Sequence, residues 1–150
     1  MDDDCYTCRQ TAAGAANLPP RELIAEDEHW RVAHAFGSAL AGWLVLLPRR
    51  HVTAVSELTG DEAAGLGSWQ VRLSRALAEV TGCAKTYVAQ FAEKEGFARV
   101  HFHIVPRGPE LAEELRGPRV FGLLGAEGER AVGAAEMDAL ALRLRTALRR

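Results

Sequence analysis

The chain has 150 residues, of which 48% are hydrophobic and 25% are charged, and its formal net charge is −2. This length fits one domain with one sizeable core, and the composition excludes a largely disordered chain. Because 18 basic residues stand against 20 acidic ones, the charge balance also disfavours a general nucleic-acid-binding protein. We therefore expect a single domain over residues 1–150, with no nucleic-acid partner.

The start of the chain and the cysteine count bear on its compartment. The N-terminal segment Met1-Asp2-Asp3-Asp4-Cys5 is acidic, whereas a secretory signal needs a basic start and an apolar run. The longest stretch without charged side chains, residues 32–48, contains glycines and is slightly short for a membrane helix. Three cysteines, an odd number in a chain large enough to fold without disulfides, favour reduced thiols. We expect a cytoplasmic protein that has no membrane partner.

The first third of the chain predicts an irregular segment followed by a hairpin. Residues 1–20 end in two prolines, so we expect no regular element there. Residues 23–25 could form a short strand. The apolar segments 30–36 and 42–47 are separated by small residues that include glycine, as in a hairpin. Pro48 has no N–H for a ladder bond and should end the second strand.

Two helices are predicted. Thr59 and Glu62 have the spacing of a capping box, which predicts a helix from about Gly60 to Val80 that stops at Gly82. Residues 134–148 predict a second helix with a basic end, which suits the negative end of the helix dipole. Apolar residues recur at helical spacing in both segments: Leu66, Trp69, Leu73, Leu77 and Val80, then Met137, Leu140, Leu144 and Leu148.

The remaining segments predict two more strands and an irregular stretch. Residues 86–91 and 99–105 are typical of strands, a charged turn lies between them, and Pro106 should stop the second strand. Residues 108–129 are rich in glycine and proline and are expected to form a loop. Strands with hairpin-like connections and only two good helices indicate an α+β fold with an antiparallel sheet.

The segment around residues 99–105 contains two histidines at alternate positions. In a strand, side chains alternate between faces, so Arg99, His101 and His103 should share one surface-exposed face while Phe102 and Ile104 face the core. A neutral imidazole can attack phosphorus and form a covalent phosphoramidate. A neighbouring histidine can hold the phosphate or assist proton transfer. The same pattern also fits two polar surface residues or two metal ligands.

Three segments resemble the histidine triad superfamily. Residues 100–107, VHFHIVPR, resemble its signature of histidines at alternate positions followed by apolar residues. Residues 44–52, LVLLPRRHV, resemble its second recurrent segment, and Cys5-x-x-Cys8 resembles the start of many bacterial members. The resemblance covers roughly residues 5–109, with a C-terminal loop and helix in 110–150. It implies a five-stranded antiparallel sheet with a long helix and a C-terminal helix, usually in a homodimer.

The resemblance also implies an enzyme. Members hydrolyse nucleoside phosphoramidates or dinucleoside polyphosphates through a covalent nucleotidyl-histidine intermediate. The middle position of the triad is His101, which is the expected nucleophile. The third position is His103, the expected phosphate contact and proton-handling group. The implied partner is a small-molecule nucleotide, and the chemistry itself requires no cofactor.

The first position of the triad departs from the family pattern, because it is Arg99. A guanidinium keeps its charge and cannot act as a base, although Arg99 could bind the substrate. In members with the Cys-x-x-Cys start, the first histidine is a ligand of a structural zinc ion. Here Cys5, Cys8 and His51 would supply three ligands, whereas such a site usually has four. Another residue (His34, His29 or Cys83) or water could complete the shell, or the site could be metal-free or bind zinc weakly.

The region that binds the nucleotide in relatives departs as well. Relatives often carry a glutamine and a serine or threonine before the triad, and residues 93–98 contain neither. We expect Glu93 and Glu95 to point away from the phosphate and Gln90, on the preceding strand, to contact the substrate. The aspartate that often binds ribose near residue 36 is also missing.

These departures leave two alternatives to an active hydrolase. The first is a nucleotide-binding or regulatory protein that keeps the fold but has weak or lost catalysis. The second is a zinc-stabilised interaction module that does not bind nucleotides.

Overall fold

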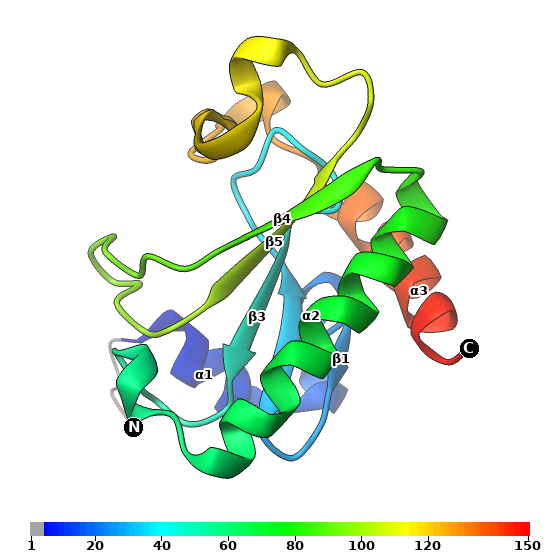
Figure 1. Cartoon of the computed structure of the whole chain (residues 1–150). Coiled ribbons are helices and arrows are strands. Elements are labelled where there is room, and N and C mark those ends of the chain that lie inside the picture. The colour runs from blue at the N-terminus through cyan, green and yellow to red at the C-terminus, as the bar shows by residue number, and fades with distance from the viewer. Residues whose placement is uncertain (1–4) are drawn as a thin grey trace.

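A five-stranded antiparallel sheet organises the chain (Figure 1), and its strand order is β1-β2-β3-β5-β4. The structure is a computed structural model that describes residues 5–150; residues 1–4, on which the argument against a secretory signal rests, lie outside the described residues. The strands are β1 (Ala25–Glu26), β2 (Trp30–His34), β3 (Leu44–Pro48), β4 (Lys85–Ala89) and β5 (Phe102–Arg107). The α+β fold expected from the sequence is confirmed.

Strands β2 and β3 form the predicted hairpin. Val32 lies opposite Leu46 in this pair, so alternate apolar residues fall on the same face of the sheet. The turn before β3 contains Gly42, whose φ of 90° is in a region that favours glycine. A Cβ atom at Gly42 would lie 3.1 Å from the ring of Pro106. Glycine therefore permits both the turn and its close approach to β5.

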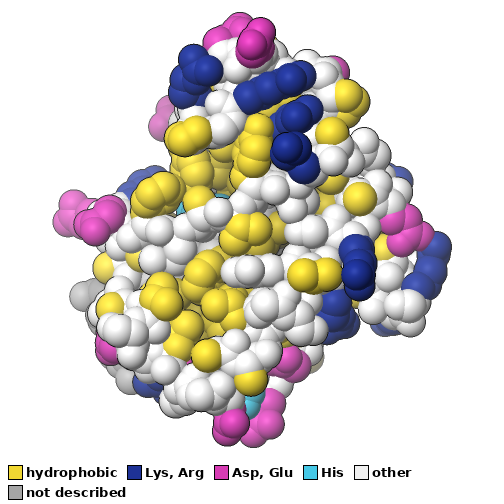
Figure 2. Space-filling model, in the orientation of Figure 1, with side chains coloured by type: hydrophobic (Ala, Val, Ile, Leu, Met, Phe, Trp, Pro, Cys, Tyr) yellow, Lys and Arg dark blue, Asp and Glu magenta, His cyan; other side chains and the backbone are white. Residues whose placement is uncertain are grey.

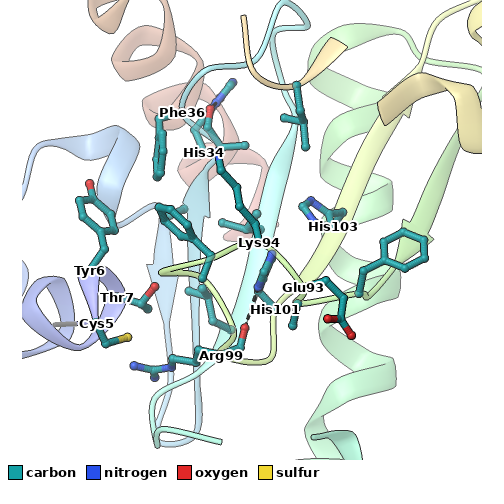
Figure 3. Close-up of a pocket in the computed structure, with 18 of the residues that line it drawn as sticks. Cys5, Tyr6, Thr7, His34, Phe36, Glu93, Lys94, Arg99, His101 and His103 are labelled. Carbon is teal, nitrogen blue, oxygen red and sulfur yellow. Dashed lines mark hydrogen bonds between the residues drawn. The ribbon is translucent and has the colours of Figure 1, made fainter. Parts of the chain in front are cut away.

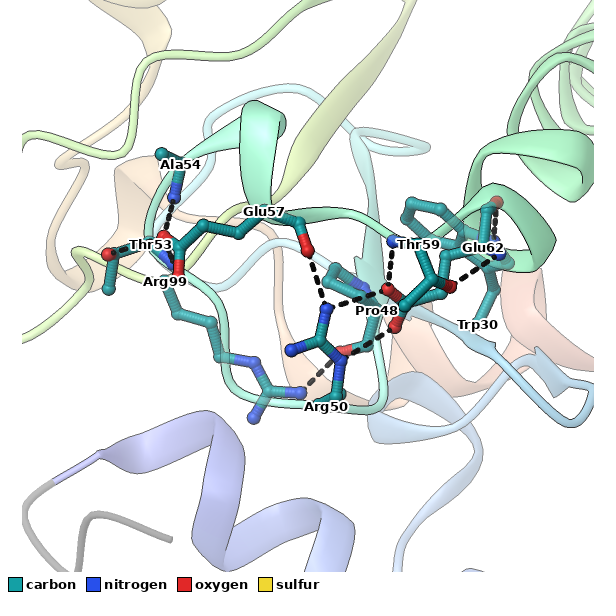
Figure 4. Close-up of polar contacts among 9 residues, drawn as sticks. All are labelled: Trp30, Pro48, Arg50, Thr53, Ala54, Glu57, Thr59, Glu62 and Arg99. Atoms are coloured by element: carbon teal, nitrogen blue, oxygen red, sulfur yellow. Dashed lines mark hydrogen bonds and ion pairs between the residues drawn. The ribbon is translucent and has the colours of Figure 1, made fainter.

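The long helix α2 (Gly60–Thr81) begins at the predicted capping box. The Thr59 hydroxyl accepts a hydrogen bond from the Glu62 amide at 3.1 Å, and the Glu62 carboxylate accepts one from the Thr59 amide at 2.8 Å. Arg50 donates to the same carboxylate at 2.8 Å (Figure 4). The hydrogen bond from Arg50 is the main cause that lowers the pKa of Glu62 to about 2. Gly82, with a φ of 72°, ends the helix as predicted.

The two faces of the sheet are covered differently. Helices α2 and α3 (Ala134–Leu148) pack together on one face (Figure 1), where their apolar stripes meet the sheet. The core there is formed by fully buried residues, among them Trp30, Leu44, Leu46, Leu73, Ile104 and Leu144. A smaller cluster on the opposite face joins Trp43 and Val105 to Val120. The helix bounds 134–148 agree with the prediction.

Some elements differ from the sequence prediction. Residues 6–13 were expected to be irregular but form helix α1 (Tyr6–Ala13), and the expected loop 108–129 contains short 3-10 helices, including η5 (Gly117–Leu123). The expected strand 99–105 begins only at Phe102, and Pro106 lies inside it rather than stopping it. Pairing between β3 and β5 covers only Phe102 to Ile104 on β5, so Pro106 costs no ladder bond to β3.

No helix within residues 5–150 combines the length and the apolar character that crossing a membrane requires.

Candidate functional site

A cavity of about 290 Å³ opens on the sheet face that α2 and α3 leave uncovered. Its walls come from helix α1, strands β2 and β3, the segment 91–97 between β4 and β5, and residues of η5 and just beyond it. Both His101 and His103 line it (Figure 3). The site is therefore assembled from segments far apart in the sequence.

His101 is held by the backbone next to it. Its Nδ1 lies 2.7 Å from the carbonyl oxygen of Arg99 (Figure 3). A carbonyl oxygen only accepts hydrogen bonds, so Nδ1 must carry the proton and donate it. In a neutral ring, Nε2 then keeps its lone pair on the opposite side of the imidazole. This is the tautomer that a nitrogen nucleophile needs.

His103 has the opposite tautomer. Its Nδ1 accepts a hydrogen bond from the indole N–H of Trp43 at 3.0 Å, and an indole nitrogen only donates. In the neutral ring the proton is therefore on Nε2. Burial, with a smaller contribution from the nearby His101, lowers the pKa of His103 to about 4. At neutral pH, His103 is an uncharged hydrogen-bond donor.

Aromatic side chains fix the His103 ring. Trp43 and Phe121 each meet it edge to face, with ring centroids 5.8 Å and 5.0 Å away, and the His101 ring lies 4.8 Å away on another side. As a result, His103 is only 7% exposed. The expectation of an exposed histidine face is wrong for this residue, because η5 covers that part of the sheet.

Arg99 is also buried, with 3% exposure. Its carbonyl orients His101, but its side chain extends toward Cys5 and away from the imidazoles (Figure 3). Its Nη1 donates to the sulfur of Cys8 at 3.2 Å, and its Nη2 donates to the carbonyl oxygen of Pro48. Arg99 lines the cavity, and its predicted contact with the substrate stays a prediction.

The other expected substrate contact, Gln90, is not among the residues that line the cavity. Its buried Oε1 has no hydrogen-bond partner in the described part of the chain. Glu93, which was expected to point away, instead lines the cavity together with Lys94 (Figure 3). The Ser38 hydroxyl donates a hydrogen bond to the Leu40 carbonyl oxygen and accepts one from the Leu40 amide.

Sequence reasoning missed several cavity residues. Tyr6, Phe36 and Phe97 form an aromatic cluster whose ring centroids are 5.3 to 6.2 Å apart. Arg31 on β2 also lines the cavity although it is only 3% exposed, and burial lowers its pKa. Alternation along β2 could have placed Arg31 on this face, but no pattern brings Tyr6 to Phe97.

Cys5, Cys8 and His51 lie together as expected. Their ligand atoms are all within 4.8 Å of one another, so the three residues form a cluster that could hold a metal ion. The residues considered as a fourth ligand lie elsewhere. His34 is held by the Ala35 carbonyl and the Gly42 amide, and neither His29 nor Cys83 belongs to this cluster of described residues.

The electrostatics of this cluster involve Arg99. Burial acts to raise the pKa of the Cys5 thiol, but hydrogen bonds from Cys8 and the positive charge of Arg99 outweigh it. The pKa of Cys5 is therefore lowered from its ordinary value. A guanidinium beside the cluster thus favours the thiolate.

Comparison by sequence finds no match, either among protein-family models or among curated proteins. Comparison by structure finds histidine triad proteins. A histidine triad protein from Bradyrhizobium japonicum is 28% identical, with a TM-score of 0.69 over 84% of this chain and 89% of the other.

Two more distant structures cover nearly the whole chain. A hypothetical histidine triad nucleotide-binding protein from Sulfolobus tokodaii is 16% identical, with a TM-score of 0.71 over 97% of this chain and 92% of the other. A zinc-bound histidine triad family protein from Mycobacterium smegmatis is 20% identical, with a TM-score of 0.67 over 97% of this chain and 93% of the other. The chain therefore has the fold of histidine triad proteins, with His103 on strand β5 and His101 immediately before it.

Proposed function

We propose that the protein is a nucleotide hydrolase that uses His101 as a covalent nucleophile. The observation that carries this proposal is the hydrogen bond from His101 Nδ1 to the Arg99 carbonyl, which leaves the Nε2 lone pair free beside the cavity. The choice of a nucleotide as substrate is supported by the structural neighbour from Sulfolobus tokodaii, a hypothetical histidine triad nucleotide-binding protein.

The reaction proceeds in two displacements. His101 Nε2 attacks the α-phosphorus of the substrate and forms a P–N bond, while the bond from phosphorus to the leaving amine or phosphate breaks. The leaving group departs with that bonding pair and takes up a proton. Water then attacks the same phosphorus, the P–N bond breaks, and a nucleoside monophosphate is released together with the free imidazole.

His103 stabilises the phosphate during both steps. Its Nε2–H is a neutral donor, fixed in direction because Trp43 holds Nδ1 on the other side of the ring. Since the pKa of His103 is about 4, this residue donates a hydrogen bond rather than a full proton at neutral pH. Neither His101 nor His103 belongs to the cluster of possible metal ligands among the described residues.

The substrates that fit this proposal are nucleoside phosphoramidates and dinucleoside polyphosphates. The aromatic cluster of Tyr6, Phe36 and Phe97 offers flat apolar surface to a base, and Phe36 is 50% exposed. Lys94 lines the same cavity and supplies positive charge for a second phosphate.

We further propose a cytoplasmic homodimer. The three cysteines, Cys5, Cys8 and Cys83, are free thiols, as suits a reducing compartment. Strand β4 is an edge of the sheet, and its Val88 is 46% exposed. Pairing of β4 with a second copy would satisfy that edge. Light scattering on the purified chain tests the dimer, and a monomer at micromolar concentration would contradict it.

The test of the reaction is turnover of adenosine 5′-phosphoramidate and of diadenosine polyphosphates by the wild-type protein and by His101→Ala. We expect the variant to lose nearly all turnover. The matched control is His29→Ala, since His29 is partly exposed and does not line the cavity. Undiminished turnover by His101→Ala would rule out the nucleophile.

A second function is favoured by one observation. No carboxylate occupies the position near residue 36 where relatives often bind ribose, and the Ser38 hydroxyl there is engaged by the Leu40 backbone. A nucleotide-binding protein with weak catalysis would fit this arrangement. Binding of adenosine monophosphate by calorimetry, with no turnover of any substrate above, would establish this function instead.

A further inference from the structure

The Arg99 side chain lies against the cluster of Cys5, Cys8 and His51. Its Nη1 donates to Cys8 Sγ at 3.2 Å. Its Nη2 donates to the Pro48 carbonyl oxygen, as Figure 4 shows. The guanidinium is buried, as are Cys5 and Cys8, so little water is present to screen its charge. Arg99 therefore links helix α1, which begins after Cys5, to the end of strand β3.

The donor set around this cluster does not fit a closed zinc site. Structural zinc binds four ligands, each of which donates a lone pair to the metal. A guanidinium has no lone pair to donate, and it carries a permanent positive charge. A zinc ion bound to Cys8 Sγ at about 2.3 Å would lie at most about 5.5 Å from Arg99 Nη1. Two like charges at that distance in a buried site repel each other strongly.

The contact between Cys8 and His51 is also closer than zinc ligation predicts. Cys8 Sγ lies 3.1 Å from His51 Nδ1, which is close enough for a hydrogen bond that involves sulfur. Two ligands at tetrahedral angles around zinc, one sulfur and one nitrogen, would be about 3.6 Å apart. The cluster is thus arranged as a hydrogen-bonded group.

We propose that the guanidinium of Arg99 replaces the metal ion of this cluster, so that Arg99, Cys8 and His51 hold helix α1 against the sheet by hydrogen bonds alone. Arginine suits this role because it keeps its charge at any physiological pH and has several donors in a fixed plane. One donor serves the Cys8 sulfur and another the Pro48 carbonyl.

This replacement matters for the cavity. Helix α1 and its first residues bring Cys5, Tyr6 and Thr7 to the cavity wall. The same residue, Arg99, holds α1 with its side chain and orients His101 with its carbonyl. The wall of the cavity therefore does not depend on the supply of a metal. Metal content and the docking of α1 can both be measured without a substrate, so this proposal can fail while the proposed reaction holds.

The first experiment measures zinc per chain after incubation with zinc chloride and dialysis. We expect the wild-type protein to retain less than about a tenth of one zinc, because the guanidinium occupies the site. The variant Arg99→His removes the fixed charge and supplies a fourth ligand, so it should retain close to one zinc per chain. Arg72→His, on the exposed surface of α2, is the matched control and should behave as the wild type.

Two results would overturn the proposal. Retention of about one zinc by the wild-type protein would show that Arg99 does not exclude the metal. Failure of folded Arg99→His to retain zinc would show that the Arg99 position is not that of a fourth ligand. Circular dichroism establishes that the variant is folded before its zinc content is measured.

The second experiment needs no variant. Hydrogen–deuterium exchange of the α1 amides is compared with and without a zinc chelator during purification and labelling. We expect the same protection in both samples, because hydrogen bonds rather than a metal hold the helix. An increase of several-fold in exchange across α1, with unchanged exchange in α3, would mean that a metal holds α1 and would overturn the proposal.

Discussion

Replacing His103 with asparagine should make the free energy of unfolding depend less on pH. Burial lowers the pKa of His103 from 6.5 to about 4 in the folded protein. Between these values the unfolded chain binds a proton that the folded protein excludes. The stability that comes from keeping the His103 imidazole neutral is therefore fully present above pH 6.5 and is lost as the pH falls toward 4. The difference in pKa corresponds to roughly 3 kcal/mol of unfolding free energy.

Urea unfolding of the wild type and of His103→Asn at several pH values between 7.5 and 4 measures this contribution. Asparagine has an acceptor near the position of Nδ1, so the Trp43 donor keeps a partner, and the loss of ring volume lowers stability equally at every pH. Burial also lowers the pKa of His34, whose contribution has the same sign and remains in both proteins. The difference between the two proteins should shrink by roughly 3 kcal/mol from pH 7 to pH 4. A difference that stays constant across this range would refute the burial of a neutral imidazole.

Three further predictions concern the cap, the core and the histidine network. Thr59→Ala should lower the unfolding free energy by about 1 kcal/mol in urea, because it removes the acceptor at the start of α2; an unchanged midpoint would contradict the cap. Leu73→Ala should cost about 2–5 kcal/mol in the same assay, whereas Val71→Ala, at a side chain that is 49% exposed, should cost less than about 1 kcal/mol; equal losses would contradict the assigned core face. Trp43→Phe should lower kcat/KM on adenosine phosphoramidate by about tenfold, since it leaves His103 Nδ1 without its donor; an unchanged rate would show that this donor does not matter.

Local signals in the sequence were sufficient for much of the fold. The Thr59–Glu62 pair and Gly82 located both ends of α2, because capping depends on side chains within a few residues of the helix end. Alternation placed His103 on the face opposite to Ile104, since the period of a strand follows from its backbone geometry.

The parts that sequence reasoning missed depend on contacts between distant segments. In helix α1 only Thr7 and Cys8 are buried, so the helix has no apolar stripe to reveal it. Phe121 lies in a segment rich in glycine and proline and gives no periodic signal, yet it covers His103. Likewise, the alternation rule gives the face of Arg99 but not the direction of its side chain, which is set by Cys8 and Pro48.

The most direct test of the proposed nucleophile is detection of the covalent intermediate. Wild-type protein is mixed with adenosine 5′-phosphoramidate and quenched in alkali within milliseconds to seconds, since phosphoramidate bonds to histidine are labile in acid, and its peptides are examined by mass spectrometry. We predict an added adenylyl group on His101, absent from His101→Ala and still formed by His29→Ala. Turnover of the substrate with no adduct on His101 at any time point, or with the adduct on another residue, would contradict the assignment.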